Sequence, residues 1–233
     1  PMARPTVRNP ERGDARTRLL DAARDEIRRR GFTATTVDDL CRAAGVTKGA
    51  FFHHFDSKEA LGVPAAEHWA RTTSELFAGA PYHEPADPLA RVLAYIDFRR
   101  ALVAGVPAEF TCLGGTMTQE VFDSHPAIRE ACRASIFEHA ATLEPDIAAA
   151  MKARQMKARQ TKSDWKPDWT AASLAAHTQA VLQGAFILAK ATGERAVALD
   201  SIDHLERYVR LLFSVAPQTD KGNTDEQARS DRT

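Results

Sequence analysis

The segment from Thr47 to Phe55 holds the residues whose types and spacing point most directly to a chemical task. Thr47 can cap a short helix by accepting a hydrogen bond from its first turn. That turn would hold one cation and two small residues, Lys48, Gly49 and Ala50. A helix N-terminus attracts phosphate through its dipole, and small side chains let a helix approach another surface closely. The segment is therefore suited to contact a nucleic acid duplex.

Two histidines, His53 and His54, follow in the same short helix. Adjacent helical residues point about 100° apart, so the two side chains cannot both face the core, and we expect at least one to contact DNA. A neutral imidazole donates or accepts a hydrogen bond, and a protonated one adds charge. A solvated surface pair is the alternative. A metal site is disfavoured, because adjacent side chains diverge and no third ligand is in view.

Other features of the sequence argue against several classes of protein. Three widely spaced cysteines without a C-x-x-C pair indicate a reducing compartment and neither disulfides nor zinc, so we expect a cytoplasmic protein. No glycine-rich phosphate loop, G-x-S-x-G or H-E-x-x-H motif is present, so we expect no enzyme, no catalytic residue and no cofactor. No run approaches the roughly 20 apolar residues of a membrane span, so we expect no membrane partner.

The elements that must position the 47–55 segment are predicted to be helices. Apolar residues recur at helical spacing and no alternating strand pattern appears, which predicts an all-α fold. Thr17 can start a first helix that ends at Gly31, and Thr36 with Asp39 has the form of a capping box for a second helix. Gly45 then breaks the chain before the short third helix. This order predicts a helix-turn-helix.

Apolar residues of these helices form the expected core of the small module. Phe51 and Phe55 lie one helical turn apart, so they face the same way. The other expected members of this core are Leu19, Ile27, Leu40 and Val46.

Longer helical patterns follow the module. They cover residues 58–77, with a kink expected at Pro64, and then residues 89–102, 110–123 and 126–160. The last of these contains a tandem five-residue duplication, Met151–Gln160, which we expect to lengthen a solvated helix end.

Two apolar stripes, at residues 174–189 and 202–212, are wider than a helix needs to pack inside its own domain. Paired with the same helices of a second copy, they would form a four-helix bundle, which predicts a homodimer. Packing within one chain is the alternative.

The order of helix, capped helix, glycine turn, short helix and then Ser57-Lys58-Glu59-Ala60-Leu61 resembles the tetracycline-repressor (TetR) family over residues 16–61. The resemblance implies phosphate contacts beside the reading helix and base contacts from that helix. The predicted phosphate contacts are Thr36, Phe52 and Lys58, the predicted base contacts are Lys48, Gly49, Ala50 and His53, and Thr47 and His54 complete the predicted DNA-binding set. Tyrosine is usual in the family where Phe52 stands, and phenylalanine lacks the hydroxyl that would bond phosphate.

An effector pocket between residues 89 and 150 is also implied by the resemblance. Candidate lining residues are large or soft apolar side chains near irregular stretches, namely Phe98, Phe110, Cys112, Met117, Phe122 and Phe186. Each of them is also a common core filler. Some family members sense electrophiles through a thiol near the position of Cys112, and Gly114 and Gly115 would leave room for a reactant. An inert buried thiol is the favoured alternative.

The predicted organisation has four parts: a basic flexible arm at residues 1–15, a DNA-binding helix-turn-helix at 16–62, an effector-binding and dimerisation domain at 63–216 and a disordered tail at 217–233. Residues 1–60 hold 12 Lys and Arg against 9 Asp and Glu, an asymmetry that suits phosphate binding. We therefore expect a repressor that binds a pseudo-palindromic double-stranded DNA operator as a homodimer and is released by an unidentified small-molecule or electrophile effector. The alternative is a helical protein-interaction module without specific DNA binding.

Overall fold

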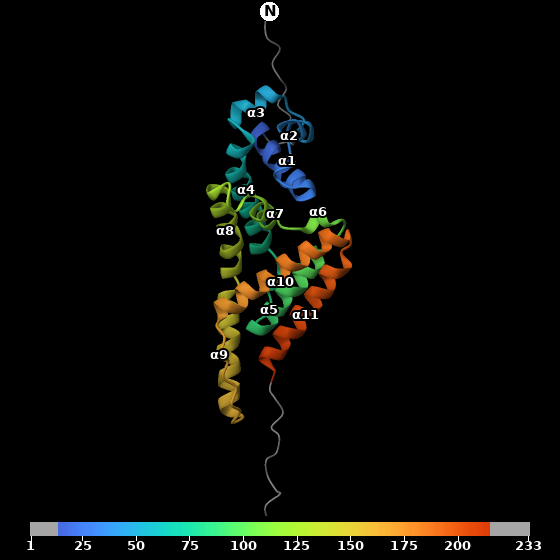
Figure 1. The fold of residues 1–233 in the computed structure, drawn as a ribbon. Coiled ribbons are helices and arrows are strands. Elements are labelled where there is room, and N and C mark those ends of the chain that lie inside the picture. Colours follow the sequence, from blue (N-terminus) through green and yellow to red (C-terminus); the bar gives the residue numbers. More distant parts are fainter. Residues whose placement is uncertain (1–13, 215–233) are drawn as a thin grey trace, which may run out of the picture.

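The structure, a computed structural model, describes residues 14–214, and every regular element in this range is helical (Figure 1). This confirms the predicted all-α fold. Of the arm expected at residues 1–15, only Asp14 and Ala15 are among the described residues. The tail expected at residues 217–233 lies wholly outside them.

Three helices at the N-terminal end of the described chain form a unit that we call the head. They are α1 (Ala15–Arg30), α2 (Val37–Ala44) and α3 (Lys48–His54). The expectation that Thr17 caps the first helix is wrong: Asp14 is the N-cap, because its carboxylate accepts from the backbone N–H of Thr17 at 2.7 Å. Gly31 ends α1 with a φ of 91°, as the glycine in the sequence predicted.

The other two caps of the head confirm the sequence pattern. The Thr36 hydroxyl accepts from the N–H of Asp39, and the Asp39 carboxylate accepts from the N–H of Thr36, which makes the predicted capping box of α2. The Thr36 hydroxyl also donates to the Asp39 carboxylate at 2.7 Å, and this bond, with the one from the Thr36 N–H, lowers the pKa of Asp39 to about 2. Thr47 caps α3 by accepting from the N–H of Ala50 at 3.1 Å.

The remaining helices form a larger unit that we call the body. They are α4 (Lys58–Ala78), the 3-10 helix η2 (Pro81–His83), α5 (Pro88–Leu102), α6 (Pro107–Phe110), α7 (Leu113–Val121), α8 (Pro126–Ala141), α9 (Glu144–Gln160), α10 (Ala171–Thr192) and α11 (Ala196–Phe213). The single helix expected over residues 126–160 is wrong, because the chain breaks between α8 and α9. Pro145 lies in the first turn of α9, where its missing N–H costs nothing and where it cannot continue the preceding helix.

Helix α4 runs from the head into the body without interruption (Figure 1). Pro64 lies inside this helix, so the boundary expected between residues 62 and 63 falls within it. Helix α4 approaches α8 closely at Gly62, because a Cβ built on this glycine would lie 2.4 Å from Cδ1 of Ile128. The head and the body are therefore joined by packed helices.

The core of the head consists of the residues expected from the sequence. Leu19, Leu40 and Phe51 are 0% exposed. Ile27 and Phe55 are also buried, and Val46 packs against them at partial exposure. Five residues of α7 and α8 complete the same cluster: Leu113, Met117, Val121, Ile128 and Cys132. The head thus shares its hydrophobic core with the body.

A second core lies around α10, which packs against α11, α8 and α9. Leu174, Leu182 and Ala189 of α10 are buried in it, with Ile202 and Val209 of α11. By length and composition, α10 is the one described helix apolar enough to cross a membrane. In this fold it is the central helix of the body.

The tandem duplication lies at the end of α9, and its two copies have different surroundings. Arg154 of the first copy is 7% exposed, donates to the carbonyls of Phe213 and Ser214, and stacks over Trp165. Arg159, its equivalent in the second copy, is exposed. The expectation of a purely solvated end is wrong at Arg154 and at Ala158, which is 3% exposed.

We expect Arg154→Ala to lower the free energy of unfolding by about 1.5–3 kcal/mol, because it leaves two carbonyls without their charged donor. Arg159→Ala is the matched control and should change it by less than about 0.5 kcal/mol, since that side chain is solvated. Urea unfolding followed by circular dichroism measures both. Equal losses from the two variants would contradict the role given to Arg154.

Candidate DNA-binding and ligand-binding sites

One face of α3 is turned to solvent. Phe51, which is 0% exposed, anchors the helix to the head. Lys48, Gly49, Phe52 and His53 are all exposed, with Phe52 at 52%. These four positions repeat at spacings of one and four residues, so they share one side of the helix. The buried Phe51 thus fixes which side chains α3 presents.

Lys48 carries the only cation on this face. Its ammonium pairs with Asp38 of α2 at 2.8 Å, and this carboxylate raises the pKa of Lys48. Both side chains are more than half exposed, so the pair is weakly held and can exchange for a phosphate or a base edge.

Three other members of the predicted DNA-binding set already have partners within the head. The hydroxyls of Thr36 and Thr47 cap α2 and α3. The Lys58 ammonium donates to the carbonyls of Phe32 and Thr33 at 3.0 and 3.1 Å and lies over the Phe32 ring. The two threonines thus stabilise the head, and Lys58 ties the start of α4 to the loop after α1, whether or not these side chains also touch DNA.

The last members of the set lie on different sides of α3. Ala50 and His54 are partly buried, whereas His53 is exposed. The two histidine rings are 5.0 Å apart at an interplanar angle of 66°. The side chain of His53 is therefore the imidazole more open to a ligand.

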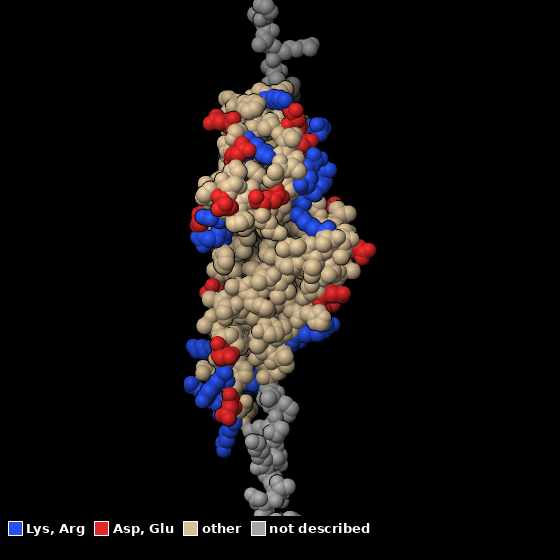
Figure 2. All heavy atoms as spheres, viewed as in Figure 1, with Lys and Arg blue, Asp and Glu red and all other residues tan. Residues whose placement is uncertain are grey.

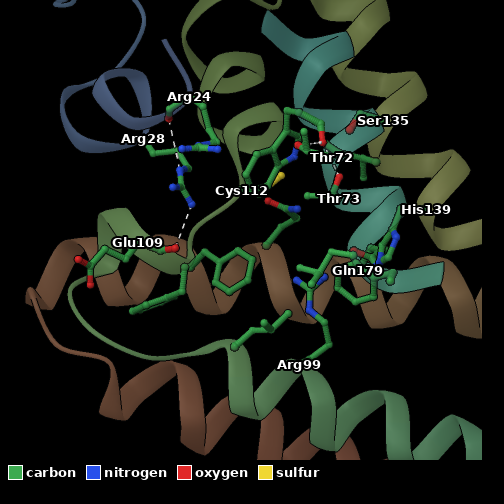
Figure 3. A pocket seen from close by; sticks show the side chains of 18 of the residues that line it. Arg24, Arg28, Thr72, Thr73, Arg99, Glu109, Cys112, Ser135, His139 and Gln179 are labelled. Atoms are coloured by element: carbon green, nitrogen blue, oxygen red, sulfur yellow. Dashed lines mark hydrogen bonds between the residues drawn. The ribbon is translucent and has the colours of Figure 1, made fainter. Parts of the chain in front are cut away.

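A cavity of about 320 Å³ lies between the head and the body (Figure 3). Its walls come from α1, α4, α5, α8 and α10 and from the segment around α6. Apolar walls are provided by Trp69, Leu76, Phe77, Leu102, Val103, Phe110, Ile136 and Phe186. Polar groups join them, among them three arginines and a histidine.

Of the predicted lining residues, Phe110, Cys112 and Phe186 line this cavity. Phe98 packs against Phe77 and Tyr82 in the body core instead. Met117 is 0% exposed in the core shared with the head, and Phe122 is 58% exposed. Helical spacing does not reveal which side of a helix faces a void, so these three expectations do not describe the cavity.

Cys112 is half-buried and caps α7, with its sulfur accepting from the N–H of Gly115 at 3.3 Å. The room expected for a reactant at Gly115 is taken by Gln183. A Cβ built on Gly115 would lie 2.1 Å from the Gln183 side-chain oxygen. The glycine therefore serves the packing of α7 against α10.

Sequence reasoning missed that the head itself lines the cavity. Arg24 and Arg28 of α1 lie in its wall. The Arg28 guanidinium donates to the carbonyl of Glu109 at 3.0 Å (Figure 3) and to that of Thr111 at 3.5 Å. The four-residue spacing of Arg24 and Arg28 predicts that they share one face of α1, but it does not reveal what that face contacts.

A second link joins the head to α7. The Glu120 carboxylate accepts from the backbone N–H of Thr33 at 2.8 Å and lies against Gly31, where a Cβ would be 2.2 Å from its oxygen. The loop after α1 is therefore held by α7, the helix whose N-cap is Cys112.

A chain of hydrogen bonds forms the polar end of the cavity. Gln179 donates to the Tyr95 hydroxyl at 3.0 Å, and that hydroxyl lies 2.9 Å from Nε2 of His139. Burial, helped by the charge of Arg99, lowers the pKa of His139 to about 4. His139 is therefore neutral at pH 7, and its Nε2 accepts the Tyr95 proton.

The head is similar in sequence to known proteins. Residues 19–62 match the family described as bacterial regulatory proteins, tetR family. Over these residues the chain is similar to the TetR family. The transcriptional repressor KstR2 of Rhodococcus jostii is 52% identical over 46 residues, which are 20% of this chain and 22% of KstR2. The repressor NemR of Escherichia coli is 38% identical over 87 residues, 35% of this chain and 41% of NemR.

The matched stretches thus span well under half of these relatives. Beyond them the TetR-family likeness is one of fold. A TetR regulator from Chloroflexus aurantiacus superposes with a TM-score of 0.68 at 24% identity, covering 85% of this chain and 96% of that one. Reduced Escherichia coli NemR gives a TM-score of 0.63 at 24% identity, covering 84% and 96%.

Acidification should destabilise the folded protein through His139. The unfolded chain binds a proton near pH 6.5, whereas the folded chain binds it only near pH 4, so stability falls as the pH drops through that window. The loss should reach up to about 3 kcal/mol. His139→Gln keeps an acceptor for Tyr95 but cannot titrate, so its urea stability should fall less over the same pH series. Parallel curves for the two proteins would refute this assignment.

Proposed function

We propose that this protein is a ligand-responsive transcriptional repressor that binds operator DNA as a homodimer and is released by a small molecule. The observation that carries the proposal is the exposed face of α3, with Lys48 and His53 at its surface and Phe51 buried behind them. A helix presented in this way fits the major groove of B-form DNA. The match of residues 19–62 to a family of bacterial regulatory proteins supports a regulatory role over an enzymatic one. A regulator of this kind would act in the cytoplasm, where it can reach DNA.

The comparisons agree with this proposal. KstR2 and NemR are both named as transcriptional repressors. A further neighbour in fold, a TetR-family regulator with 20% identity and a TM-score of 0.62, has been solved with 26 base pairs of operator DNA. Two-fold symmetry would set two copies of α3 roughly 34–36 Å apart or somewhat more, for a pseudo-palindromic operator.

Helices α10 and α11 offer a face for dimerisation. Large apolar side chains are exposed along it: Ile187 and Leu188 of α10, and Tyr208 and Leu211 of α11, the last at 70%. In the view of Figure 2 the surface over the middle of α10 has no Lys, Arg, Asp or Glu, whereas charged side chains gather over the head and the far end of α9. Gly184 lies on the same face, with nothing within 4 Å of an added Cβ. A second copy would cover this face with its own α10 and α11.

Release is a shift in population between head positions. The cavity has walls from both the head and the body, and Arg28 links α1 to the backbone of Glu109 and Thr111. An occupant that alters these contacts favours another position of α1, and with it another spacing of the two α3 helices. Its effect on DNA binding equals its differential affinity for the two states.

The dimer face can be tested with one substitution. Leu188→Glu places a carboxylate in the predicted contact and should weaken dimerisation roughly tenfold or more, because the charge must be desolvated. Met156→Glu is the matched control, since Met156 is 55% exposed on α9, away from this face. Sedimentation equilibrium measures both, with circular dichroism to confirm folding. A folded Leu188→Glu protein that dimerises as tightly as the parent would place the interface elsewhere.

DNA binding is tested on the intergenic DNA beside the protein's own gene. Lys48→Ala and His53→Ala should each weaken specific binding by about 1–3 kcal/mol, since each removes a contact of α3. Lys152→Ala removes an exposed lysine of α9 and is the control for net charge. A salt series read by fluorescence anisotropy should show affinity falling steeply with ionic strength. Absence of specific binding at low salt would favour the protein-interaction module.

A further inference from the structure

Arg99 differs from the other arginines that line the cavity. Arg24 pairs with Asp25 at 2.7 Å, and Arg28 pairs with the same carboxylate at 3.1 Å. Arg99 has no carboxylate partner among residues 14–214. Because Arg99 lines a partly apolar cavity, its charge lacks both full hydration and a counter-ion.

The next residue on α5 shows that carboxylates are within reach of this helix. Arg100 pairs with Asp203 at 2.9 Å and Glu206 at 2.5 Å, both on α11, and also with Asp97. Adjacent helical positions point about 100° apart. Arg100 therefore reaches the acidic side of α11, while Arg99 is turned into the cavity.

Aromatic rings hold the Arg99 guanidinium in place. Its central carbon lies 5.3 Å from the centre of the Phe77 ring and 5.6 Å from that of Phe186. In Figure 3 the side chain extends from α5 into the cavity, on the side where Gln179 and His139 lie. Stacking covers the faces of a guanidinium and leaves its N–H groups free at the edge, where a carboxylate can accept two of them.

No acidic group of the cavity wall meets that edge. Glu109 is the one acidic residue among those lining the cavity, and its carboxylate accepts from the backbone N–H of Val106 at 2.9 Å. That hydrogen bond turns it toward its own loop, so Arg99 is left for an anion that the described chain does not supply. Apolar side chains of the same cavity wall include Trp69, Leu76 and Phe110.

We propose that the cavity binds an amphipathic carboxylate, with the carboxylate paired to the edge of Arg99 and the apolar body against Trp69, Leu76 and Phe110. That such a ligand acts as the effector rests on the regulatory function proposed above. The neutral His139 and the amide of Gln179 lie on the Arg99 side of the cavity and offer no competing negative charge.

The test uses the purified full chain and matched probes: octanoate, phenylbutyrate and naphthylacetate, each beside its uncharged primary amide. Isothermal calorimetry on the DNA-free protein should show at least one carboxylate bound roughly 10- to 100-fold more tightly than its amide. Arg99→Met keeps the length of the side chain and removes its charge, so the preference should fall to within about twofold. Arg24→Met removes an arginine that already has carboxylate partners and should keep the preference.

Circular dichroism of Arg99→Met checks that the variant is folded, and Arg99→Lys gives a second reading if it is not. The lysine keeps the charge but loses the two-pronged geometry, so it should retain part of the preference. Tighter binding of the amides, an undiminished preference in folded Arg99→Met, or no carboxylate binding at millimolar concentration would each overturn the proposal. DNA binding is measured separately, so a specific DNA binder that ignores carboxylates would refute the ligand class and leave the regulator function standing.

Discussion

The position of the head depends on the hydrophobic core that it shares with α7 and α8. Leu19 and Phe51 of the head lie in the same buried cluster as Leu113 and Met117 of α7. Rotating the head freely would expose this surface to water, so it can move only to positions that keep most of the burial. The orientation of α3 therefore depends on the packing of the head against α7 and α8, and the N-cap of α7, Cys112, lines the cavity.

Two polar links follow the same route as this shared core. Glu120 of α7 accepts from the loop after α1, and Arg28 of α1 donates to the backbone of Glu109 and Thr111. Close-packed interfaces tend to switch between discrete arrangements instead of deforming continuously. A ligand in the cavity would thus meet the contacts that position α3, with no need for a long relay through the body.

Electrostatics give the cavity its chemical character. Two of the three arginines that line the cavity, Arg24 and Arg28, pair with the carboxylate of Asp25, which offsets their charge locally. Arg99 lies over the rings of Phe77 and Phe186 instead. His139 stays neutral because it is buried and lies near the Arg99 charge. An apolar space with one unpaired cation favours ligands that bring both an anion and a hydrophobic body.

Local sequence patterns specify the helix caps, the turn and the buried side of the helices in the head. Thr36, Thr47 and Gly45 specify caps and a turn through hydrogen bonds made within a few residues, and Phe51 and Phe55 mark the core because helical periodicity is local. Which side chains meet across the fold depends instead on tertiary packing. In the folded protein Phe98 and Met117 pack in the cores, whereas Phe122 is exposed. Arg28 of the head lines the cavity, and Arg99 has no carboxylate partner among the described residues. Those outcomes depend on the packing of helices far apart in the chain, and spacing along one helix carries no information about its neighbours.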